Sequence, residues 1–349
     1  MSETHRIYFE PVDIELEVSE DERILDAAFR QDVHLMHGCR EGQCSACKSF
    51  LLEGDVQMEK YSSFACNDAE VEEGYVLLCR AHAYDDCTIE LLNFDEDELL
   101  NAIPIQEVDC EVLSVDALTH DIVSLKMKPV DGQSFDYKPG QYADIVIPGT
   151  DGEKRSFSMA TTPDGSDHLE FIIKKYPDGK FSSLLDDGIS AGDVLHLVGP
   201  YGACTIKDGR VLPIVGLAGG AGMAPILSIL RHLAEIESPR PVHFYYGART
   251  ADDLFYLEEI VEIGSKLKDF TFTVGLSDSS PDTWEHVGIE LAEGFIHTVV
   301  DQREETLRST EVYICGPPPM VDAATEMLEG HVVPADQVFF DKFTSPITA

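Results

Sequence analysis

Four cysteines near the start of the chain constrain its fold more than any other feature. Three lie in one short segment with the spacing C-x4-C-x2-C, and the fourth follows later in the chain: Cys39, Cys44, Cys47 and Cys79. The segment that holds the first three is polar and rich in glycine, and we expect Gly38 and Gly42 to adopt positive φ angles. Such a backbone can fold tightly around a group held by the sulfurs and point its N–H groups at them.

This spacing is the ligand pattern of plant-type [2Fe–2S] proteins. A zinc site and a disulfide framework are the alternatives. Zinc sites usually pair two C-x2-C units, whereas Cys79 stands alone. No signal peptide opens the chain, which argues against disulfides. We therefore predict a [2Fe–2S] cluster. Four further cysteines lack this spacing and are expected to be small buried apolar residues: Cys66, Cys87, Cys110 and Cys204.

Charge limits the partners that the protein can bind. With 349 residues, the chain has room for two or three domains. Its net charge of −40 argues against nucleic acid or an anionic membrane as a partner. The first hundred residues hold 7 lysines and arginines against 25 aspartates and glutamates. On an electron-transfer module, such a surface favours steered docking to a basic partner, although solubility alone also explains it.

One uncharged stretch, Val211 to Leu230, is long enough to span a bilayer. Pro213 and Pro225 interrupt it, and several glycines crowd its middle. A buried strand, a glycine turn and a buried helix explain this pattern better than a membrane span. We therefore expect a soluble, cytoplasmic protein.

The pattern along the chain changes twice, which predicts three domains: 1–98, 104–208 and 209–349. In the first, strands over 5–17 and 86–92 flank a helix at Ile24–Gln31, which indicates a small α+β unit. With its cysteine spacing, this unit resembles a β-grasp ferredoxin domain. An acidic run, Asn93–Leu100, follows as a linker or short helix. In the second, short strands separated by turns indicate an antiparallel β-barrel. They are expected at Val108–Val115, Ile122–Lys128, Tyr142–Ile147, Arg155–Ala160, Leu169–Lys175 and Val194–Gly199.

The third domain alternates strands and helices, which is typical of an α/β fold with a parallel sheet. Strands are expected at Ile214–Leu217, Val242–Gly247, Phe270–Gly275 and Glu311–Cys315. Helices are expected at Met223–Ile236 and Asp253–Ile263.

Two motifs in the barrel suit a flavin nucleotide. Arg155 can bind a phosphate, Phe157 lies on the same side of its strand and can stack on a flat ring, and Ser158 can bond a ring nitrogen. Gly179, Ser182 and Ser183 mark a helix start that favours a pyrophosphate. An ordinary edge strand and a serine cap explain the same residues.

Two motifs in the third domain suit a dinucleotide. The loop Gly219-Gly220-Ala221-Gly222 joins a strand to a helix, so that a pyrophosphate can approach its backbone. Near the end, Cys315-Gly316 follows a strand at the carboxyl edge of the sheet, where open α/β folds bind ligands. Cys315 has no base beside it in the sequence, which favours packing near a nicotinamide over a role as nucleophile.

Together these motifs resemble the ferredoxin-NADP⁺ reductase superfamily: R-S-F-S at 155–158, G-G-A-G-M-A-P at 219–225, Y-G-A-R at 246–249 and C-G-P-P-P-M at 315–320. With the cysteine-rich domain in front, the whole chain resembles the reductase components of bacterial multicomponent oxygenases. The stretches Cys39–Phe50 and Glu72–Arg80 are most similar to reductases of soluble di-iron monooxygenases. Among these, the propane, short-alkane and methane monooxygenase reductases are the nearest group.

The resemblance implies roles at matching positions. Cys39, Cys44, Cys47 and Cys79 would hold the cluster. Arg155, Phe157 and Ser158 would contact FAD, with Gly179, Ser182 and Ser183 at its pyrophosphate. Gly220, Gly222 and Pro225 would line the NADH phosphates, Cys315 and Gly316 would border the nicotinamide, and Phe343 would lie near the flavin ring. Phe157 replaces a tyrosine of many relatives, which keeps stacking and removes a hydroxyl contact.

The choice of nicotinamide cofactor depends on Arg249 and its neighbours. Arg249 could bind the 2′-phosphate of NADPH, but Asp252 and Asp253 follow closely and would repel it. We therefore expect NADH.

The implied function is electron transfer from NADH through FAD and the [2Fe–2S] cluster to a di-iron hydroxylase that docks at the acidic ferredoxin domain. No general acid or base is assigned. The alternatives are a reductase of a Rieske-type dioxygenase, a reductase of a deoxysugar dehydratase system, and a carrier or redox sensor without an enzymatic role. The glycine loop at Gly219–Pro225 argues against the carrier.

Overall fold

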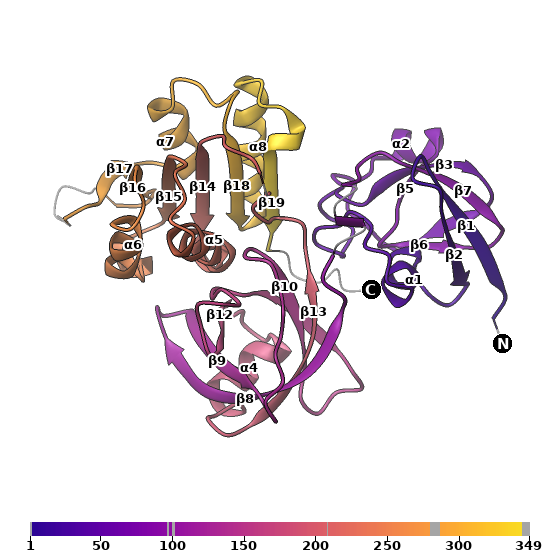
Figure 1. Ribbon diagram of the computed structural model, residues 1–349, viewed down its shortest axis with the longest axis horizontal. Coiled ribbons are helices and arrows are strands. Elements are labelled where there is room, and N and C mark those ends of the chain that lie inside the picture. Colours follow the sequence, from indigo (N-terminus) through magenta and orange to yellow (C-terminus); the bar gives the residue numbers. More distant parts are fainter. Residues whose placement is uncertain (1, 96–97, 100–101, 208, 280–286, 344–349) are drawn as a thin grey trace. The chain divides into compact units, whose positions relative to one another are not determined.

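The computed structural model describes residues 2–95, 98–99, 102–207, 209–279 and 287–343. The chain divides into two compact units (Figure 1). Among the described residues, the first comprises 2–105 with Tyr201–Ala203, and the second comprises Gln106–Pro200 and Cys204–Phe343. Within the expected acidic linker, Glu96, Asp97 and Leu100 lie outside the described residues.

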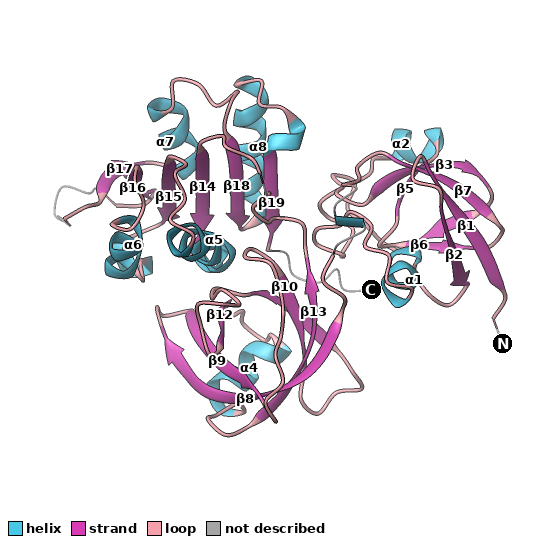
Figure 2. Ribbon diagram, viewed as in Figure 1, coloured by secondary structure: helices cyan, strands magenta, loops and turns pink. Residues whose placement is uncertain are grey.

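The first unit is built on a mixed five-stranded sheet of order β2-β1-β7-β3-β5, with a separate β4-β6 pair (Figure 2). Strands β1 and β2 alternate buried and exposed residues, and the buried set includes Ile7, Phe9 and Leu16. Helix α1 packs its apolar residues into the same core. The elements are β1 (Thr4–Glu10), β2 (Ile14–Ser19), α1 (Ile24–Arg30), β3 (Lys48–Glu53), β4 (Val56–Met58), α2 (Asp68–Glu73), β5 (Tyr75–Leu77), β6 (Ala81–Ala83) and β7 (Cys87–Leu91).

The second unit begins with a six-stranded sheet of order β11-β10-β13-β8-β9-β12. The neighbouring strands pair antiparallel, and a bridge between Met159 and Phe171 brings the two edges together, so that the sheet is a nearly closed barrel. Its elements are β8 (Gln106–Ala117), β9 (Ile122–Pro129), β10 (Tyr142–Val146), β11 (Lys154–Ser158), β12 (Leu169–Lys174), α4 (Lys180–Asp187) and β13 (Val194–Tyr201).

The rest of the second unit is a parallel six-stranded sheet of order β17-β16-β15-β14-β18-β19. Helices α5 and α6 cover one face and α7 and α8 the other, each over its own apolar cluster (Figure 1). The elements are β14 (Ile214–Gly219), η1 (Gly220–Gly222), α5 (Met223–Glu235), β15 (Val242–Ala248), η2 (Ala251–Asp253), α6 (Leu257–Gly264), β16 (Phe270–Leu276), β17 (Glu290–Glu293), α7 (Ile296–Arg303), β18 (Glu311–Gly316), α8 (Pro318–Gly330), η4 (Ala335–Gln337) and β19 (Val338–Lys342).

The α+β unit, the antiparallel barrel and the parallel sheet confirm the predicted fold class. The stretch from Val211 to Leu230 forms β14, η1 and α5, as expected, and within the described ranges no helix has the length and apolar character needed to cross a bilayer. One helix was placed wrongly. The expected helix Asp253–Ile263 begins only at Leu257, because the Asp253 carboxylate accepts hydrogen bonds from the backbone and hydroxyl of Thr250 and closes the short η2 turn instead.

Candidate cofactor sites

The predicted cluster ligands lie on two neighbouring segments of the first unit. Cys39, Cys44 and Cys47 occupy the loop before β3, and Cys79 lies in the turn between β5 and β6. The two segments are joined where the Leu78 amide donates to the Cys47 carbonyl at 3.3 Å. Cys44, Cys47 and Cys79 are at most 5% exposed, and Cys39 is partly exposed. The structure therefore brings all four predicted ligands to one site near the surface.

The four sulfurs form two pairs. The Cys44 thiol lies close enough to Cys39 to shift the pKa of the Cys39 thiol, and the Cys47 thiol does the same to Cys79. No three of the four sulfurs lie within 4.8 Å of one another. Among the described residues, one group of three potential metal ligands meets that distance, and it contains none of these cysteines. A tetrahedral zinc site, with Zn–S bonds of about 2.3 Å, would place all four sulfurs about 3.8 Å apart. The observed pairs fit two metal ions with two ligands each.

The cluster loop directs backbone amides at the sulfurs. The amides of Glu41 and Gln43 donate to Cys39 Sγ at 3.4 and 3.3 Å, and the Cys39 amide donates to Cys44 Sγ at 3.3 Å. Gly42 has the expected positive φ of +65°, and so do Arg40 and Ser45, at +54° and +59°, which the sequence did not reveal. The loop thus holds three amide donors in the positions that a cluster of anionic thiolates needs.

Gly38 does not adopt the positive φ that we expected. Gly38 instead lets the backbone pass close to the Cys44 sulfur, because an added Cβ would lie 3.0 Å from Cys44 Sγ.

These contacts change the acidity of the thiols. The Cys44 thiol and the amide donors lower the pKa of Cys39 to about 6, against the effect of burial. The Cys39 thiol, together with burial, raises the pKa of Cys44, and the Cys47 thiol and burial raise the pKa of Cys79. The loop therefore favours a thiolate at Cys39, and a thiolate is the form that binds a metal ion. The donor set and its surroundings fit a [2Fe–2S] cluster.

In the barrel, the two predicted flavin motifs lie side by side. The Phe157 ring packs on the Phe181 ring with centroids 4.9 Å apart, and Lys180 Nζ pairs with Glu153 at 2.6 Å, so β11 and the start of α4 are in contact. Arg155 and Phe157 are both partly buried on one side of β11, and Ser158 is buried. Two motifs separated in sequence thus form one surface, with a cation and an aromatic ring beside a helix N-terminus, which suits a flavin nucleotide.

The serines at the start of α4 hold the local turn together. The Ser182 hydroxyl accepts from the Tyr176 amide at 2.9 Å, and the Ser183 hydroxyl donates to the Gly179 carbonyl at 3.0 Å. An added Cβ on Gly179 would lie 2.8 Å from Ser182 Oγ, so this turn is closely packed.

A cavity of about 620 Å³ lies between the barrel and the carboxyl ends of β14, β15, β16 and β18. This is the edge at which open α/β sheets bind ligands. Of the predicted nicotinamide-nucleotide residues, Gly220 and Arg249 line the cavity, and so does Phe343, which was predicted to lie near the flavin ring. Met320, the last residue of the C-G-P-P-P-M motif, also lines the cavity. Further lining residues were not predicted from the sequence: Asp121, Ile122, Lys174, Tyr176, Ser277, Phe295 and His297. Ser277 and Phe295 could have been predicted, because each follows a strand of the parallel sheet at the edge where ligands bind. The lining residues of the barrel belong to no sequence motif and could not.

The other predicted residues lie behind the cavity wall. Gly222 approaches β18 so closely that an added Cβ would lie 2.1 Å from the Cys315 carbonyl oxygen. The Phe343 amide donates to the Gly316 carbonyl at 2.9 Å. Pro225 is buried in the first turn of α5. The structure thus places the glycine loop, the Cys315-Gly316 turn and Phe343 together, although Gly222, Pro225, Cys315 and Gly316 are not among the lining residues.

Cys315 is fully buried, and its sulfur lies 3.7 Å from that of Cys204. Burial and this contact raise the pKa of the Cys315 thiol. Such a thiol is a poor nucleophile, so the geometry favours packing over covalent chemistry.

Arg249 is largely exposed and pairs with Asp253 at 3.4 Å. Asp253 also faces His120 at 3.7 Å and lines the same cavity. A carboxylate thus lies beside the cation that could bind a 2′-phosphate.

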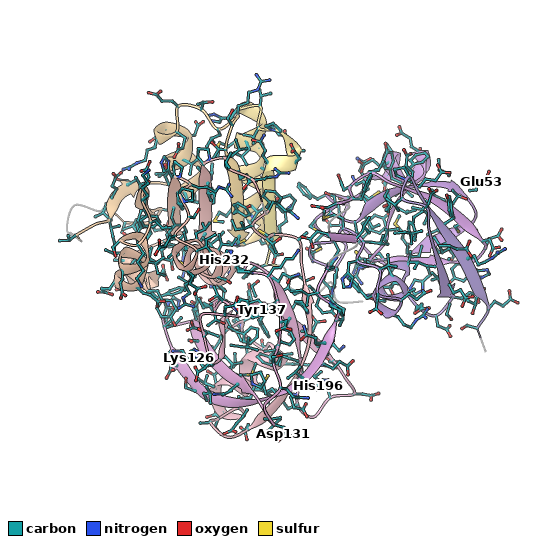
Figure 3. The ribbon with its side chains drawn as sticks, viewed as in Figure 1. Glu53, Lys126, Asp131, Tyr137, His196 and His232 are labelled. Atoms are coloured by element: carbon teal, nitrogen blue, oxygen red, sulfur yellow. The ribbon has the colours of Figure 1, made fainter. Side chains whose placement is uncertain are left out.

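A buried polar network holds the barrel against α5 and α6. Glu170 of β12 accepts from Ser124 at 2.6 Å and Tyr256 at 2.5 Å, and Arg231 of α5 reaches it at 3.2 Å. The Tyr137 hydroxyl bonds Thr161 at 3.0 Å near this face of the barrel (Figure 3). The network fixes the two walls of the cavity relative to each other.

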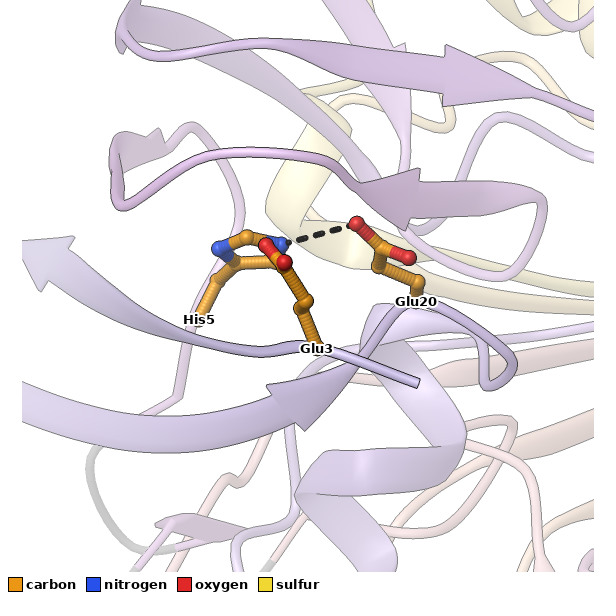
Figure 4. A group of neighbouring side chains, drawn as sticks. All are labelled: Glu3, His5 and Glu20. Atoms are coloured by element: carbon orange, nitrogen blue, oxygen red, sulfur yellow. Dashed lines mark hydrogen bonds and ion pairs between the residues drawn. The ribbon is translucent and has the colours of Figure 1, made fainter. Parts of the chain in front are cut away.

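A second group of potential ligands lies in the first unit, away from the four cysteines in sequence. Glu3, His5 and Glu20 point toward one another (Figure 4). His5 Nε2 faces Glu20 Oε1 at 3.3 Å, an ion pair that accounts for the arrangement without a metal ion.

Comparison with known proteins identifies three domains in the chain. Three family models match in order: a 2Fe-2S iron-sulfur cluster binding domain over 7–84, an oxidoreductase FAD-binding domain over 109–206 and an oxidoreductase NAD-binding domain over 217–326. The chain is 64% identical to the propane 2-monooxygenase reductase component of Mycolicibacterium goodii, with 99% of both chains covered. It is 62% identical to that of Rhodococcus jostii, with 99% of this chain and 93% of the relative covered.

The chain belongs to the family of propane 2-monooxygenase reductase components. With the three matched domains, this membership shows that the protein is an oxidoreductase that transfers electrons from NAD(P)H through FAD and a [2Fe–2S] cluster. It serves an oxygenase as its reductase component. Among solved structures, a ferredoxin reductase in carbazole 1,9a-dioxygenase is 31% identical, with a TM-score of 0.75 and 99% of both chains covered.

Proposed function

We propose that this reductase oxidises NADH and supplies electrons to the di-iron hydroxylase of a propane or other short-alkane monooxygenase in the cytoplasm. The observation that carries the proposal is the 64% identity, over 99% of both chains, to a propane 2-monooxygenase reductase component. The toluate 1,2-dioxygenase electron transfer component of Pseudomonas putida is 28% identical over 95% of both chains. The difference favours the monooxygenase system over a dioxygenase system.

The geometry supports the proposed roles of the site residues. Cys39, Cys44, Cys47 and Cys79 would hold the cluster, since their two sulfur pairs suit two irons. Arg155, Phe157, Ser158 and the turn at Gly179–Ser183 would hold FAD. Gly220 and Arg249 would contact the nicotinamide nucleotide directly, and Phe343 would lie near the flavin ring. Gly222, Pro225, Cys315 and Gly316 would shape the wall behind the nucleotide. The corresponding domains would be 1–98, 104–208 and 209–349.

When bound, the flavin and the cluster would together convert the two electrons of NADH into single electrons. The chain's own residues hold the cofactors in position. The network around Glu170 and Arg231 holds the two walls of the cavity together, and the close contact of Gly222 with β18 fixes the loop under the nucleotide. The loop amides of Glu41 and Gln43 would stabilise negative charge on Cys39.

The charges around Arg249 support NADH as the donor. Asp253 already pairs with Arg249 and lines the cavity, so a 2′-phosphate would meet a carboxylate there. We expect kcat/KM for NADH to exceed that for NADPH in steady-state assays with a dye acceptor. A preference for NADPH would contradict this assignment.

The excess of acidic residues in the first hundred positions supports docking of the ferredoxin domain to a basic surface of the hydroxylase. Reversing Asp95 and Glu98 together with Glu96 and Asp97 to lysines is expected to slow electron delivery at low salt. Unchanged coupling at low salt would exclude this segment from the docking surface.

The test of the proposed partner is co-purification from the source cells, followed by iron, acid-labile sulfide and EPR analysis of the protein that binds. We expect a partner with two irons and no sulfide. A partner with a Rieske-type signal would assign the chain to a dioxygenase system instead.

A further inference from the structure

Arg80 follows the fourth predicted cluster ligand directly and is almost completely buried, at 6% exposure. Its guanidinium donates to Glu59 Oε2 at 2.9 Å and to Glu41 Oε2 at 2.5 Å. Glu41 belongs to the cluster loop, and Glu59 follows β4. A single buried cation thus connects the turn that carries Cys79 with the loop that carries Cys39, Cys44 and Cys47.

This contact reaches the amides that face the sulfurs. Glu41, held by its carboxylate, directs its own amide at Cys39 Sγ at 3.4 Å. The next residue, Gly42, lies against Arg80 and Tyr61: an added Cβ would be 2.9 Å from Arg80 Cγ and 2.9 Å from Tyr61 Cβ. The Gly42 amide faces the Cys79 thiol and lowers the pKa of that thiol, against the larger effects of Cys47 and burial. Movement of Arg80 would therefore displace two of the donors that stabilise thiolate charge.

The surrounding charges fix Arg80 in place. Arg23 donates to Glu59 at 3.1 and 2.7 Å, and His82 lies 3.1 Å from it. Burial would raise the pKa of Glu59, but these bonds and the Arg23 charge lower it to about 2, so Glu59 stays ionised at neutral pH. Glu41, Glu59, Arg23 and Arg80 then balance to zero charge. Loss of the Arg80 cation would leave one negative charge beside the cluster loop.

One polar atom of this network is unsatisfied. Within the part of the chain that the structure describes, Arg80 Nε is buried and has no hydrogen-bond partner. It lies next to Gly42, 3.2 Å from the position of an added Cβ. A buried N–H without an acceptor costs free energy, and an anionic cluster in the loop would supply negative charge beside it.

We propose that Arg80 is a positioning residue for the [2Fe–2S] cluster, which holds the amides that face Cys39 and Cys79 and whose buried charge raises the reduction potential of the cluster. This inference rests on the proposed cluster ligands. Reduction adds a negative charge, so a nearby cation stabilises the reduced form. The sign of the effect follows directly: removing the cation lowers the potential, and removing the opposing carboxylate raises it.

The test is a redox titration of the full-length holoprotein, monitored by EPR, with iron and sulfide measured for each variant. Arg80→Gln is expected to lower the ratio of reduced to oxidised cluster at a fixed potential by about tenfold, which corresponds to a midpoint lower by about 59 mV for one electron. Glu41→Gln keeps an acceptor oxygen for Arg80 and removes the charge, so its midpoint is expected to rise. Arg80→Lys keeps the positive charge but loses the guanidinium that donates to both Glu41 and Glu59. This variant is expected to lose iron to a chelator faster than the parent protein, with a smaller shift in midpoint than Arg80→Gln.

Arg6→Gln is the matched control. Arg6 lies on β1 and forms an exposed ion pair with Asp86, so its replacement is expected to leave the midpoint unchanged. Shifts of the same sign for Arg80→Gln and Glu41→Gln would indicate a loosened loop and overturn the electrostatic role. If Arg80→Gln fails to hold a cluster, the midpoint of Glu41→Gln is the deciding measurement. A Glu41→Gln midpoint that does not rise above that of the parent protein would overturn the proposal. Absence of iron and sulfide from the unmutated protein would instead refute the cluster assignment on which this inference rests.

Discussion

The contact between Gly222 and β18 determines how closely the nucleotide loop approaches the sheet. An added Cβ at this position would meet the Cys315 carbonyl oxygen at 2.1 Å and Gly316 Cα at 2.6 Å. Both are backbone atoms of a central strand, which cannot move as a flexible side chain can. The absence of a side chain is therefore a steric requirement at Gly222.

Gly222→Ala is expected to destabilise the second unit by roughly 1–3 kcal/mol and to raise KM for NADH, because the overpacked loop must move toward the cavity. Calorimetric unfolding and steady-state kinetics measure the two effects. Gly330→Ala at the end of α8 is the control, since an added Cβ there meets nothing within 4 Å. A Gly222→Ala protein with parental stability and KM would contradict this account.

At the scale of the elements, the hydrophobic pattern predicted many of the strands and α5. Strand β8 alternates buried and exposed residues, whereas β14, β18 and the first two turns of α5 are continuous buried runs. Strand β3 of the first sheet was not predicted. The short strands β4, β5 and β6 were not predicted, since three residues carry no period. Motifs located the cysteines and the glycine loop. They could not reveal the Arg80 network, because its partners Glu41 and Glu59 are distant in sequence and charged residues of this kind are common on a solvated surface.

A pH-sensitive contact joins β15, an interior strand of the parallel sheet, to the residue that follows α7. Glu304 accepts from Tyr245 at 2.6 Å and lies 2.7 Å from His243 Nδ1. The hydrogen bond to Glu304, and the negative charges of Glu304, Asp269 and Glu290, raise the pKa of His243 against the effect of burial. A histidine with a raised folded-state pKa stabilises the fold below its unfolded pKa of about 6.5, and this contribution is lost as the pH rises through the folded value.

We therefore expect His243→Gln to lower the free energy of unfolding more at pH 6 than at pH 8. Chemical unfolding of the parent and the variant at both pH values measures the difference. Tyr245→Phe removes a bond to the same carboxylate without a group that titrates in this range, so its cost is expected to be equal at the two pH values. An equal cost of His243→Gln at pH 6 and pH 8 would show that the pair does not titrate as described.

At the scale of the whole molecule, the chemistry is divided between the two units. The cysteine loop belongs to the first, whereas the flavin surface and the nucleotide cavity belong to the second. The two units have separate apolar cores: the cluster of Ile7, Phe9 and Leu16 in one, and the clusters of the barrel and the parallel sheet in the other. A change confined to the cysteine loop should therefore leave the second unit folded and active.

Cys44→Ser tests this division. The variant is expected to lose electron transfer through the cluster, because serine is a weaker ligand for iron than a thiolate and one sulfur pair is broken. It should retain NADH oxidation with ferricyanide, which can accept electrons from the flavin in the second unit. Cys66→Ser is the control: it changes another buried cysteine of the same unit, whose thiol faces the Tyr75 carbonyl at 3.9 Å, and should keep both activities. If Cys44→Ser lost both activities while Cys66→Ser kept them, the cluster would be required for the folding or the flavin content of the second unit, and the two units would not be functionally separable.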